Sequence, residues 1–169
     1  MSHKSVIAAM FLVASMSAVA AAQNNDPFQT TEDDRIQMQQ CQEAVRDIRA
    51  SGKKASLRDC IGRVSDLCLE IPENQTTQGM VACVMREQQW WDGQLNFFYG
   101  ALRQTLSPEA KTGLRDIQRA WIKYKDLKCG FAHVFFEGGT MAQPIGAGCL
   151  LRTTAERTIE LSSWLEMRN

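Results

Sequence analysis

The chain has 169 residues, with 19 basic and 19 acidic side chains and six cysteines. Because its formal net charge is zero, the composition gives no electrostatic reason to expect a nucleic acid or an anionic membrane as a partner. The length suits one domain. No useful stretch alternates polar and apolar residues as a strand would, whereas apolar residues recur every three or four positions, so we predict an all-α fold.

Residues 1–22 have the features of a signal peptide. His3 and Lys4 form a short basic start, residues 6–20 are apolar or small, and several alanines precede a polar stretch. This order favours a cleaved signal, although an uncleaved anchor is the alternative because the apolar run is almost long enough to span a bilayer. We therefore expect an exported mature chain that begins at about Gln23 and has no transmembrane anchor.

The mature chain is expected to begin with a flexible lead-in over residues 23–30, followed by one helical domain over residues 31–169. Residues 77–106 should form the central helix, because two neighbouring apolar stripes run along them at helical spacing. The first stripe consists of Val81, Val84, Gln88, Trp91, Leu95, Phe98 and Leu102, and the second of Met80, Cys83, Trp90, Phe97 and Ala101. Such a broad apolar surface requires other helices to cover it.

Further helices are expected over about residues 31–50, 56–70, 107–135 and 150–165, which gives a small bundle of about five helices. Thr31 can cap the first of them, and Ser107 followed by proline can begin the fourth. The fourth carries an apolar stripe of Leu114, Ile117, Trp121, Tyr124, Phe131 and Phe135. Because the joint before it is short, we expect the third and fourth helices to form a long central antiparallel hairpin.

Residues 137–148 contain four glycines and a proline, so we predict a loop rather than a regular helix. Cys129 and Cys149 flank this segment, and a disulfide between them would hold it ready for binding. Its candidate binding residues are Glu137, Gly138, Gly139 and Thr140, where glycine N–H groups and the threonine hydroxyl can be presented to a partner. The alternative is that the loop only connects two helices.

All six cysteines follow the expected signal, and an even number in a small exported protein indicates three disulfides. Zinc is the competing explanation, but no Cys-x-x-Cys pair exists and His133 is the only histidine after the signal. Six cysteines allow fifteen pairings, so sequence alone does not decide. Helix order favours the nearest-neighbour pattern, namely Cys41–Cys60, Cys68–Cys83 and Cys129–Cys149.

Several segments together resemble a known family. They are Cys83 with Trp91-Asp92-Gly93-Gln94-Leu95-Asn96-Phe97-Phe98-Tyr99, then Gln118, Trp121, Tyr124-Lys125-Asp126 and Cys129, and finally Gly138-Gly139, Cys149, Thr154, Arg157 and Leu161. Their order and spacing resemble the LprI-type lysozyme-inhibitor-like domain of exported bacterial proteins, over about residues 68–165. The resemblance implies a helical envelope protein that binds a lysozyme-like muramidase. Lys125 stands where an arginine is expected.

The polar residues in this pattern have two interpretations. Asp92, Asn96, Tyr99, Tyr124, Lys125, Asp126 and Arg157 are either a recognition surface or a structural network that ties three helices together. We favour the network, with Arg157 paired to Asp92 or Asp126, because buried polar groups need fixed partners.

An enzyme is the weakest hypothesis, since no nucleophile motif accompanies His133, and we expect no metal and no cofactor. Together with the export signal, the resemblance implies an exported binding protein that inhibits lysozyme-type muramidases, and we expect it to do so by inserting a loop. The alternative is a structural or interaction protein of the cell envelope without inhibitory activity.

Overall fold

The computed structural model describes residues 26–168, and this part of the chain is built from helices alone. The α-helices are α1 (Glu32–Ala50), α2 (Arg63–Leu69), α3 (Thr77–Thr105), α4 (Pro108–Phe135) and α5 (Ala142–Glu166). Two short 3₁₀ helices, η1 (Leu57–Cys60) and η2 (Pro72–Asn74), lie on either side of α2. The predicted all-α bundle is confirmed. The expected signal peptide, residues 1–22, lies outside the described residues.

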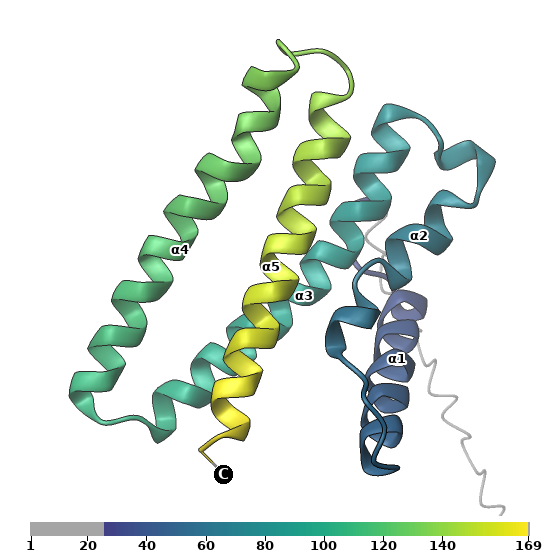
Figure 1. The fold of residues 1–169 in the computed structure, drawn as a ribbon. Coiled ribbons are helices and arrows are strands. Elements are labelled where there is room, and N and C mark those ends of the chain that lie inside the picture. Colours follow the sequence, from purple (N-terminus) through teal and green to yellow (C-terminus); the bar gives the residue numbers. More distant parts are fainter. Residues whose placement is uncertain (1–25, 169) are drawn as a thin grey trace, which may run out of the picture.

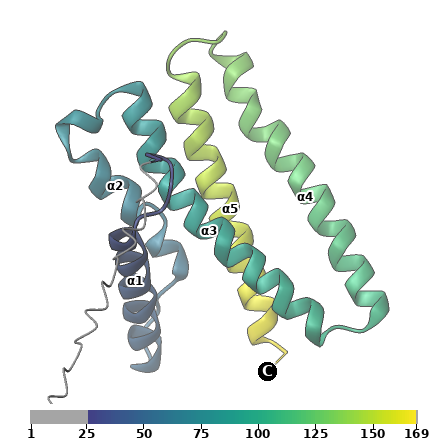
Figure 2. The same cartoon turned by 180° about the vertical axis from the view of Figure 1, so that it is seen from behind.

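Helix α5 lies between α3 and α4 (Figure 1). It packs most extensively against α3 and next against α4, whereas α1 and α2 cover the other side of α3. Viewed from behind, α3 and α4 diverge from their short joint (Figure 2). The predicted hairpin of α3 and α4 therefore exists only near that joint, because α5 takes the place where the two helices would otherwise meet.

Two apolar cores hold this arrangement. The first joins α1, α2, α3 and α5 and includes Met38, Val64, Trp90, Trp91, Leu151 and Ala155. The second joins α3, α4 and α5 close to the joint and includes Leu95, Leu102, Leu114 and Leu161. Much of the apolar stripe predicted for α4 is not core, since Ile117, Tyr124, Phe131 and Phe135 are 49%, 56%, 59% and 67% exposed. The periodicity predicted an apolar face of α4 correctly. It could not show that no other segment within residues 26–168 covers this face.

Local capping explains where three helices begin. The Thr31 hydroxyl accepts from the Asp34 N–H at 3.2 Å, and the Asp34 carboxylate accepts from the Thr31 N–H at 2.8 Å. The hydroxyl of Thr76 caps α3, and that of Ser107 caps α4, with Pro108 in the first position of that helix. These starts agree with the predicted boundaries to within one residue.

The predicted second helix is broken into η1 and α2. Gly62 has φ +100°, a left-handed conformation that favours glycine, and it turns the chain between the two pieces. The carboxylate of Glu87 on α3 then accepts from the N–H groups of Gly62, Val64 and Ser65 at 2.8, 3.0 and 2.9 Å. A side chain far along the sequence thus accepts hydrogen bonds from the otherwise unpaired backbone N–H groups at the start of α2, which no local pattern could predict.

The prediction of a loop over residues 137–148 is wrong for its second half, because α5 begins at Ala142. Pro144 lies in the first turn of α5, where a backbone N–H has no intrahelical acceptor and proline is tolerated. Gly146 faces α4, where a Cβ at this position would lie 3.4 Å from the Cys129 carbonyl oxygen, an ordinary contact distance. The proline and the glycines are therefore compatible with a closely packed helix start.

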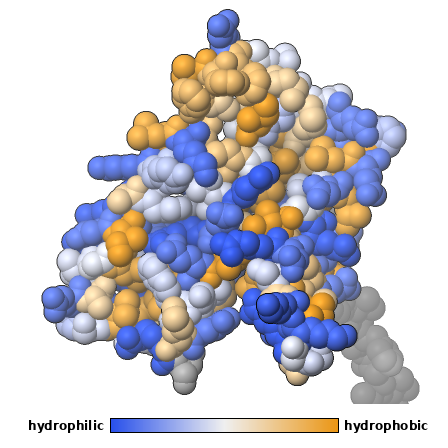
Figure 3. Space-filling model, viewed as in Figure 1, coloured by the Kyte–Doolittle hydropathy of each residue, from blue (hydrophilic) through white to orange (hydrophobic). Residues whose placement is uncertain are grey.

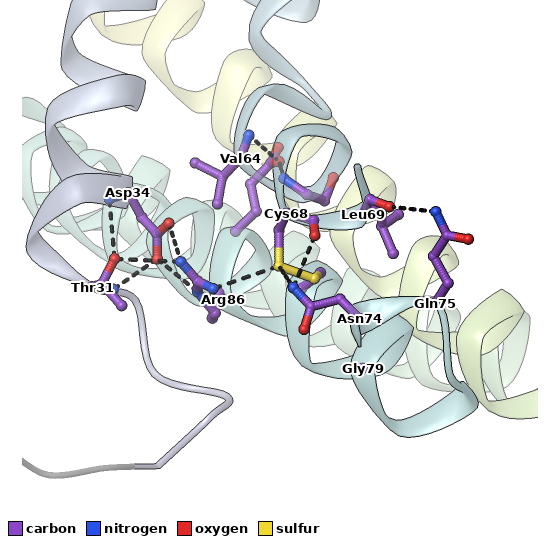
Figure 4. The surroundings of a disulfide bond; sticks show 12 residues. Thr31, Asp34, Val64, Cys68, Leu69, Asn74, Gln75, Gly79 and Arg86 are labelled. Atoms are coloured by element: carbon purple, nitrogen blue, oxygen red, sulfur yellow. Dashed lines mark hydrogen bonds and ion pairs between the residues drawn. A yellow bond between two sulfur atoms is a disulfide. The ribbon is translucent and has the colours of Figure 1, made fainter. Parts of the chain in front are cut away.

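Three disulfides staple the helices, and they join Cys41 to Cys60, Cys68 to Cys83, and Cys129 to Cys149. These are the nearest-neighbour pairs. Figure 4 shows the second of them, where the Asn74 side chain donates to the Cys68 carbonyl oxygen at 2.9 Å. Beside it, Arg86 reaches from α3 to Asp34 on α1 (Figure 4).

Of the lead-in expected over residues 23–30, residues 23–25 lie outside the described residues, and Gln29 and Thr30 are hydrogen-bonded to α3. The Thr30 N–H donates to the Gln89 side-chain oxygen at 2.8 Å, and its hydroxyl donates to the Arg86 carbonyl at 2.7 Å. The Gln89 amide in turn donates to the Gln29 side chain at 2.8 Å. Within residues 26–168, no helix is both long enough and apolar enough to cross a membrane.

Candidate functional site

The connection between α4 and α5 is a tight turn over residues 136–141 at the far end of the two helices (Figure 1). Backbone hydrogen bonds close it: the Gly138 N–H donates to the His133 carbonyl at 2.9 Å, and the Gly139 N–H donates to the Phe136 carbonyl at 2.8 Å. Because both glycine N–H groups are already bonded, the expectation that they are presented to a partner is wrong. Of the predicted donors, the hydroxyl of the exposed Thr140 remains.

The conformation of this turn is constrained. Gly138 has φ +74°, which suits glycine, and Glu137 has φ +50°, an uncommon conformation for a residue with a side chain. A Cβ at Gly139 would lie 3.0 Å from the Phe136 carbonyl oxygen. Below the turn, the Cys129–Cys149 disulfide joins α4 to α5. The turn is consequently held by its own backbone and by a covalent link.

Apolar side chains surround the turn. Phe135 is 67% exposed and Met141 is 49% exposed. The Phe135 ring lies 6.0 Å from that of Phe131 and 5.0 Å from that of Phe136, measured between centroids. In the space-filling view, hydrophobic residues gather at this end of the molecule (Figure 3). We call the turn 136–141 together with Phe135 the hairpin tip.

A groove of about 480 Å³ opens beside the hairpin tip, between α3, α4 and α5. Its walls are mostly apolar, with Val81 and Met85 from α3 and Ala142 and Ala147 from α5. Asp126, His133 and Gln143 add polar groups to its lining. The groove and the hairpin tip therefore form one continuous end of the molecule, suited to contact with a partner.

The seven polar residues predicted as one network are distributed over separate local contacts. Asp92 accepts from the Asn96 side chain at 3.1 Å, Lys125 pairs with Asp126 at 2.9 Å, and the Arg103 guanidinium lies 5.9 Å from the centre of the Tyr99 ring. Asp92, Asn96, Tyr124 and Asp126 are exposed, and each of these contacts joins residues of the same helix. The interhelical network of these seven residues is therefore not formed.

Arg157 is buried, but its partners differ from those predicted. Its Nε donates to the Gln118 side-chain oxygen on α4 at 3.0 Å, and its Nη1 pairs with Glu160 at 2.6 Å. The guanidinium also lies 5.2 Å from the Trp164 ring centre. Arg157 thus ties α5 to α4 through Gln118, rather than through Asp92 or Asp126.

Glu87 is the most important buried polar group that sequence reasoning missed. It lies between Cys83 and Trp90 on the second apolar stripe of α3, and the structure buries it completely. A carboxylate on an apolar stripe is itself a signal, because such a group needs several donors around it. The donors are backbone and indole N–H groups, so the position is structural.

Asp92 on α3 and Asp126 on α4 are both exposed and have different partners, namely Asn96 and Lys125. Among the described residues, no group of three or more histidine, cysteine, aspartate or glutamate side chains could hold a metal ion. What the geometry provides is a preformed apolar end of the molecule, which suits recognition.

Comparison with known proteins agrees with this geometry. The family model described as "Lysozyme inhibitor LprI" matches residues 68–161, which is more than half of the chain, so the chain belongs to the LprI family. The predicted family is thereby confirmed. The match begins at Cys68 and includes α3, α4 and most of α5, but α1 and η1 precede it.

One curated relative is an uncharacterized protein of Rhizobium meliloti (strain 1021), which is 40% identical over 57 residues. The aligned part covers 34% of this chain and 41% of that protein, so the chain matches less than half of its relative. No solved structure matches the chain.

Proposed function

We propose that this protein is exported to the bacterial periplasm or secreted, and that it binds and inhibits a lysozyme-type muramidase through the hairpin tip. The observation that carries the proposal is the preformed turn 136–141 at the end of the α4–α5 hairpin, in a chain of the LprI family. A disulfide and internal hydrogen bonds already order this segment, so association costs little further conformational entropy.

The chemistry of the target suggests how the tip would act. Muramidases cleave a polysaccharide with a pair of carboxyl groups in a cleft shaped for sugar rings. A narrow turn can enter such a cleft, with Thr140 offering a hydroxyl donor and Met141 and Phe135 offering apolar contact. The inserted segment would exclude the polysaccharide, and the adjacent groove would receive the rim of the cleft.

Export is supported by three disulfides, which form and persist in oxidising compartments. Mass spectrometry of the protein from an envelope fraction tests this part of the proposal. We expect an N-terminus near Gln23 and no free thiols. An intact N-terminus recovered only with membranes would contradict it.

A binding measurement with two matched variants tests the role of the tip. Met141→Glu places a carboxylate at the start of α5, where the helix dipole tolerates it, so the fold should be kept. The same charge would oppose the carboxylates of a muramidase cleft, and calorimetry should show binding weakened by tenfold or more. Met167→Glu makes the same change at the exposed opposite end of α5 and serves as the control.

The alternative function is an interaction protein of the envelope without inhibitory activity. The exposed apolar face of α4 favours it, because solvated helices usually bury their apolar stripe. Wild-type protein that binds none of several lysozyme types, but is recovered with envelope proteins from a cross-linked extract, would establish this alternative. Equal binding by both methionine variants would show that the tip is not the contact.

A further inference from the structure

Helix α4 packs on the rest of the described chain through one narrow stripe. Its buried residues are Leu114, Gln118 and Cys129, all of which lie on the side toward α5. The exposed side carries charged residues such as Asp116, Arg119 and Lys123, but an apolar row runs beside them, in which Leu127 and Val134 are 78% and 69% exposed. Large apolar side chains that stay exposed along one line of a surface helix have the composition of an interface.

The outer residues follow a coiled-coil pattern. Ile117, Ala120, Tyr124, Leu127, Phe131 and Val134 are exposed and are spaced alternately by three and four positions. This alternation is the spacing of the a and d positions of a heptad repeat, and it extends over about 26 Å of helix. We call these six residues the α4 seam. A straight seam of this kind matches another helix better than it matches a loop or a flat surface.

We propose that the α4 seam is a self-association surface, on which α4 of a second copy packs in the antiparallel direction. In an antiparallel pair each a residue faces a d residue of the other helix. The register that uses the whole seam places Ile117 opposite Val134, Tyr124 opposite Leu127, and Phe131 opposite Ala120 of the second copy. The largest apolar side chain thus faces the smallest, as good interdigitation requires.

Charges beside the seam favour this direction over the parallel one. Lys123 and Lys128 flank the seam on opposite sides, at the positions called g and e, which face each other across a parallel pair. A parallel second copy would therefore bring Lys123 against Lys128. In the antiparallel register Lys128 lies beside Trp121 of the second copy and Lys123 beside Gly130, so no lysine opposes a lysine.

The position of α4 in the fold leaves room for such a partner. The helix forms one edge of the molecule in both views, with α5 on its inner side (Figures 1 and 2). No other segment within residues 26–168 covers the seam. A second copy related by a twofold axis through the middle of the seam would consequently meet α4 first.

A size-swap experiment on residues 23–169 tests the proposal by sedimentation equilibrium with the disulfides intact. The wild type is expected to be a dimer at micromolar concentrations. Phe131→Ala leaves a gap and Ala120→Phe places two phenylalanines opposite each other, so each should weaken the dimer by about tenfold or more. The double variant Ala120→Phe/Phe131→Ala exchanges the large and the small residue and should restore most of the affinity.

The control is Arg119→Phe, which adds an aromatic side chain to an exposed position of α4 outside the seam and should leave the dimer unchanged. All substituted residues are exposed, and circular dichroism checks that the monomer fold is kept. A wild type that stays monomeric overturns the proposal. Binding of anionic vesicles or of an acidic helical peptide to the seam would then identify another occupant and would not rescue self-association. A dimer that both single variants leave intact, or that the double variant fails to restore, overturns it equally.

Discussion

Glu87 accepts a hydrogen bond from the indole Nε1 of Trp91 at 3.1 Å, one helical turn further along α3. The same carboxylate receives three backbone N–H groups at the start of α2, and both Glu87 and Trp91 are almost completely buried. Glu87 therefore links the central helix to the segment that crosses it. Its two oxygens act only as acceptors, which matches the four donors around them.

Replacing Glu87 with glutamine tests this role. A glutamine side chain has the same shape, but its NH₂ group would face N–H donors, and at least one buried donor would lose its acceptor. We expect Glu87→Gln to lower the free energy of unfolding by about 2–3 kcal/mol, measured by denaturant unfolding with the disulfides intact. Glu70→Gln, at an exposed position at the end of α2, is the control and should have little effect. Equal stability of the two variants would show that Glu87 does not organise α2.

Acid stability should depend on Asp34. Burial alone would raise the pKa of this carboxyl, but hydrogen bonds from Arg86 and Thr31 and the nearby Arg86 charge more than offset it, so the pKa is lowered. Because the folded pKa is below the unfolded one, the stabilisation is complete above about pH 4 and is lost as the pH falls through the folded pKa.

Asp34→Asn should therefore lower the free energy of unfolding by about 2 kcal/mol at neutral pH, with a smaller difference from wild type in strong acid. Urea unfolding over a pH series measures both. Asp33→Asn, in the same first turn but exposed, should change little at any pH. A difference between wild type and Asp34→Asn that is independent of pH would contradict the assignment.

Arg157 and its ion-pair partner should contribute unequally. Arg157→Ala removes a buried side chain that packs on Trp164 and leaves Gln118 without its donor, so we expect a loss of about 3 kcal/mol. Glu160→Ala should cost only about 0.5–1 kcal/mol, because that carboxylate is half exposed. Thermal unfolding of both variants measures the two losses of stability. Similar losses would mean that the ion pair, rather than the packing of Arg157, makes the larger contribution to stability.

The Cys129–Cys149 disulfide should stabilise both the fold and the hairpin tip. Replacing both cysteines by serine opens a link between residues 20 positions apart, which should lower the free energy of unfolding by about 3 kcal/mol. Hydrogen exchange should increase most at residues 130–148. If exchange there stays as slow as in the wild type, the turn is ordered by its backbone alone.

The sequence was most informative where a structure depends on neighbouring residues. Thr31, Thr76 and Ser107 cap their helices through contacts three residues away, so α1, α3 and α4 begin close to the predicted positions. The disulfide pairs followed from the order of the helices along the chain. The all-α class followed from periodicity alone.

Distant contacts decided what could not be predicted. The break at Gly62 is accompanied by hydrogen bonds to Glu87, a residue 25 positions away, and the early start of α5 places Gly146 against Cys129 of α4. The candidate site likewise was predicted only in part. The sequence located the turn at Gly138 and Gly139, but it could not show that their N–H groups donate to backbone carbonyl oxygens nearby. Periodicity likewise identified the α4 stripe without showing that Phe131 stays exposed.

The most direct test of the proposed function is the rate of cell-wall lysis by several lysozyme types, measured by turbidity with and without the oxidised chain from residue 23 to residue 169. We predict that the wild type slows lysis by at least one of them, that Met167→Glu does so equally well, and that Met141→Glu has lost most of this effect. Unchanged lysis by every enzyme in the presence of folded wild-type protein would contradict it.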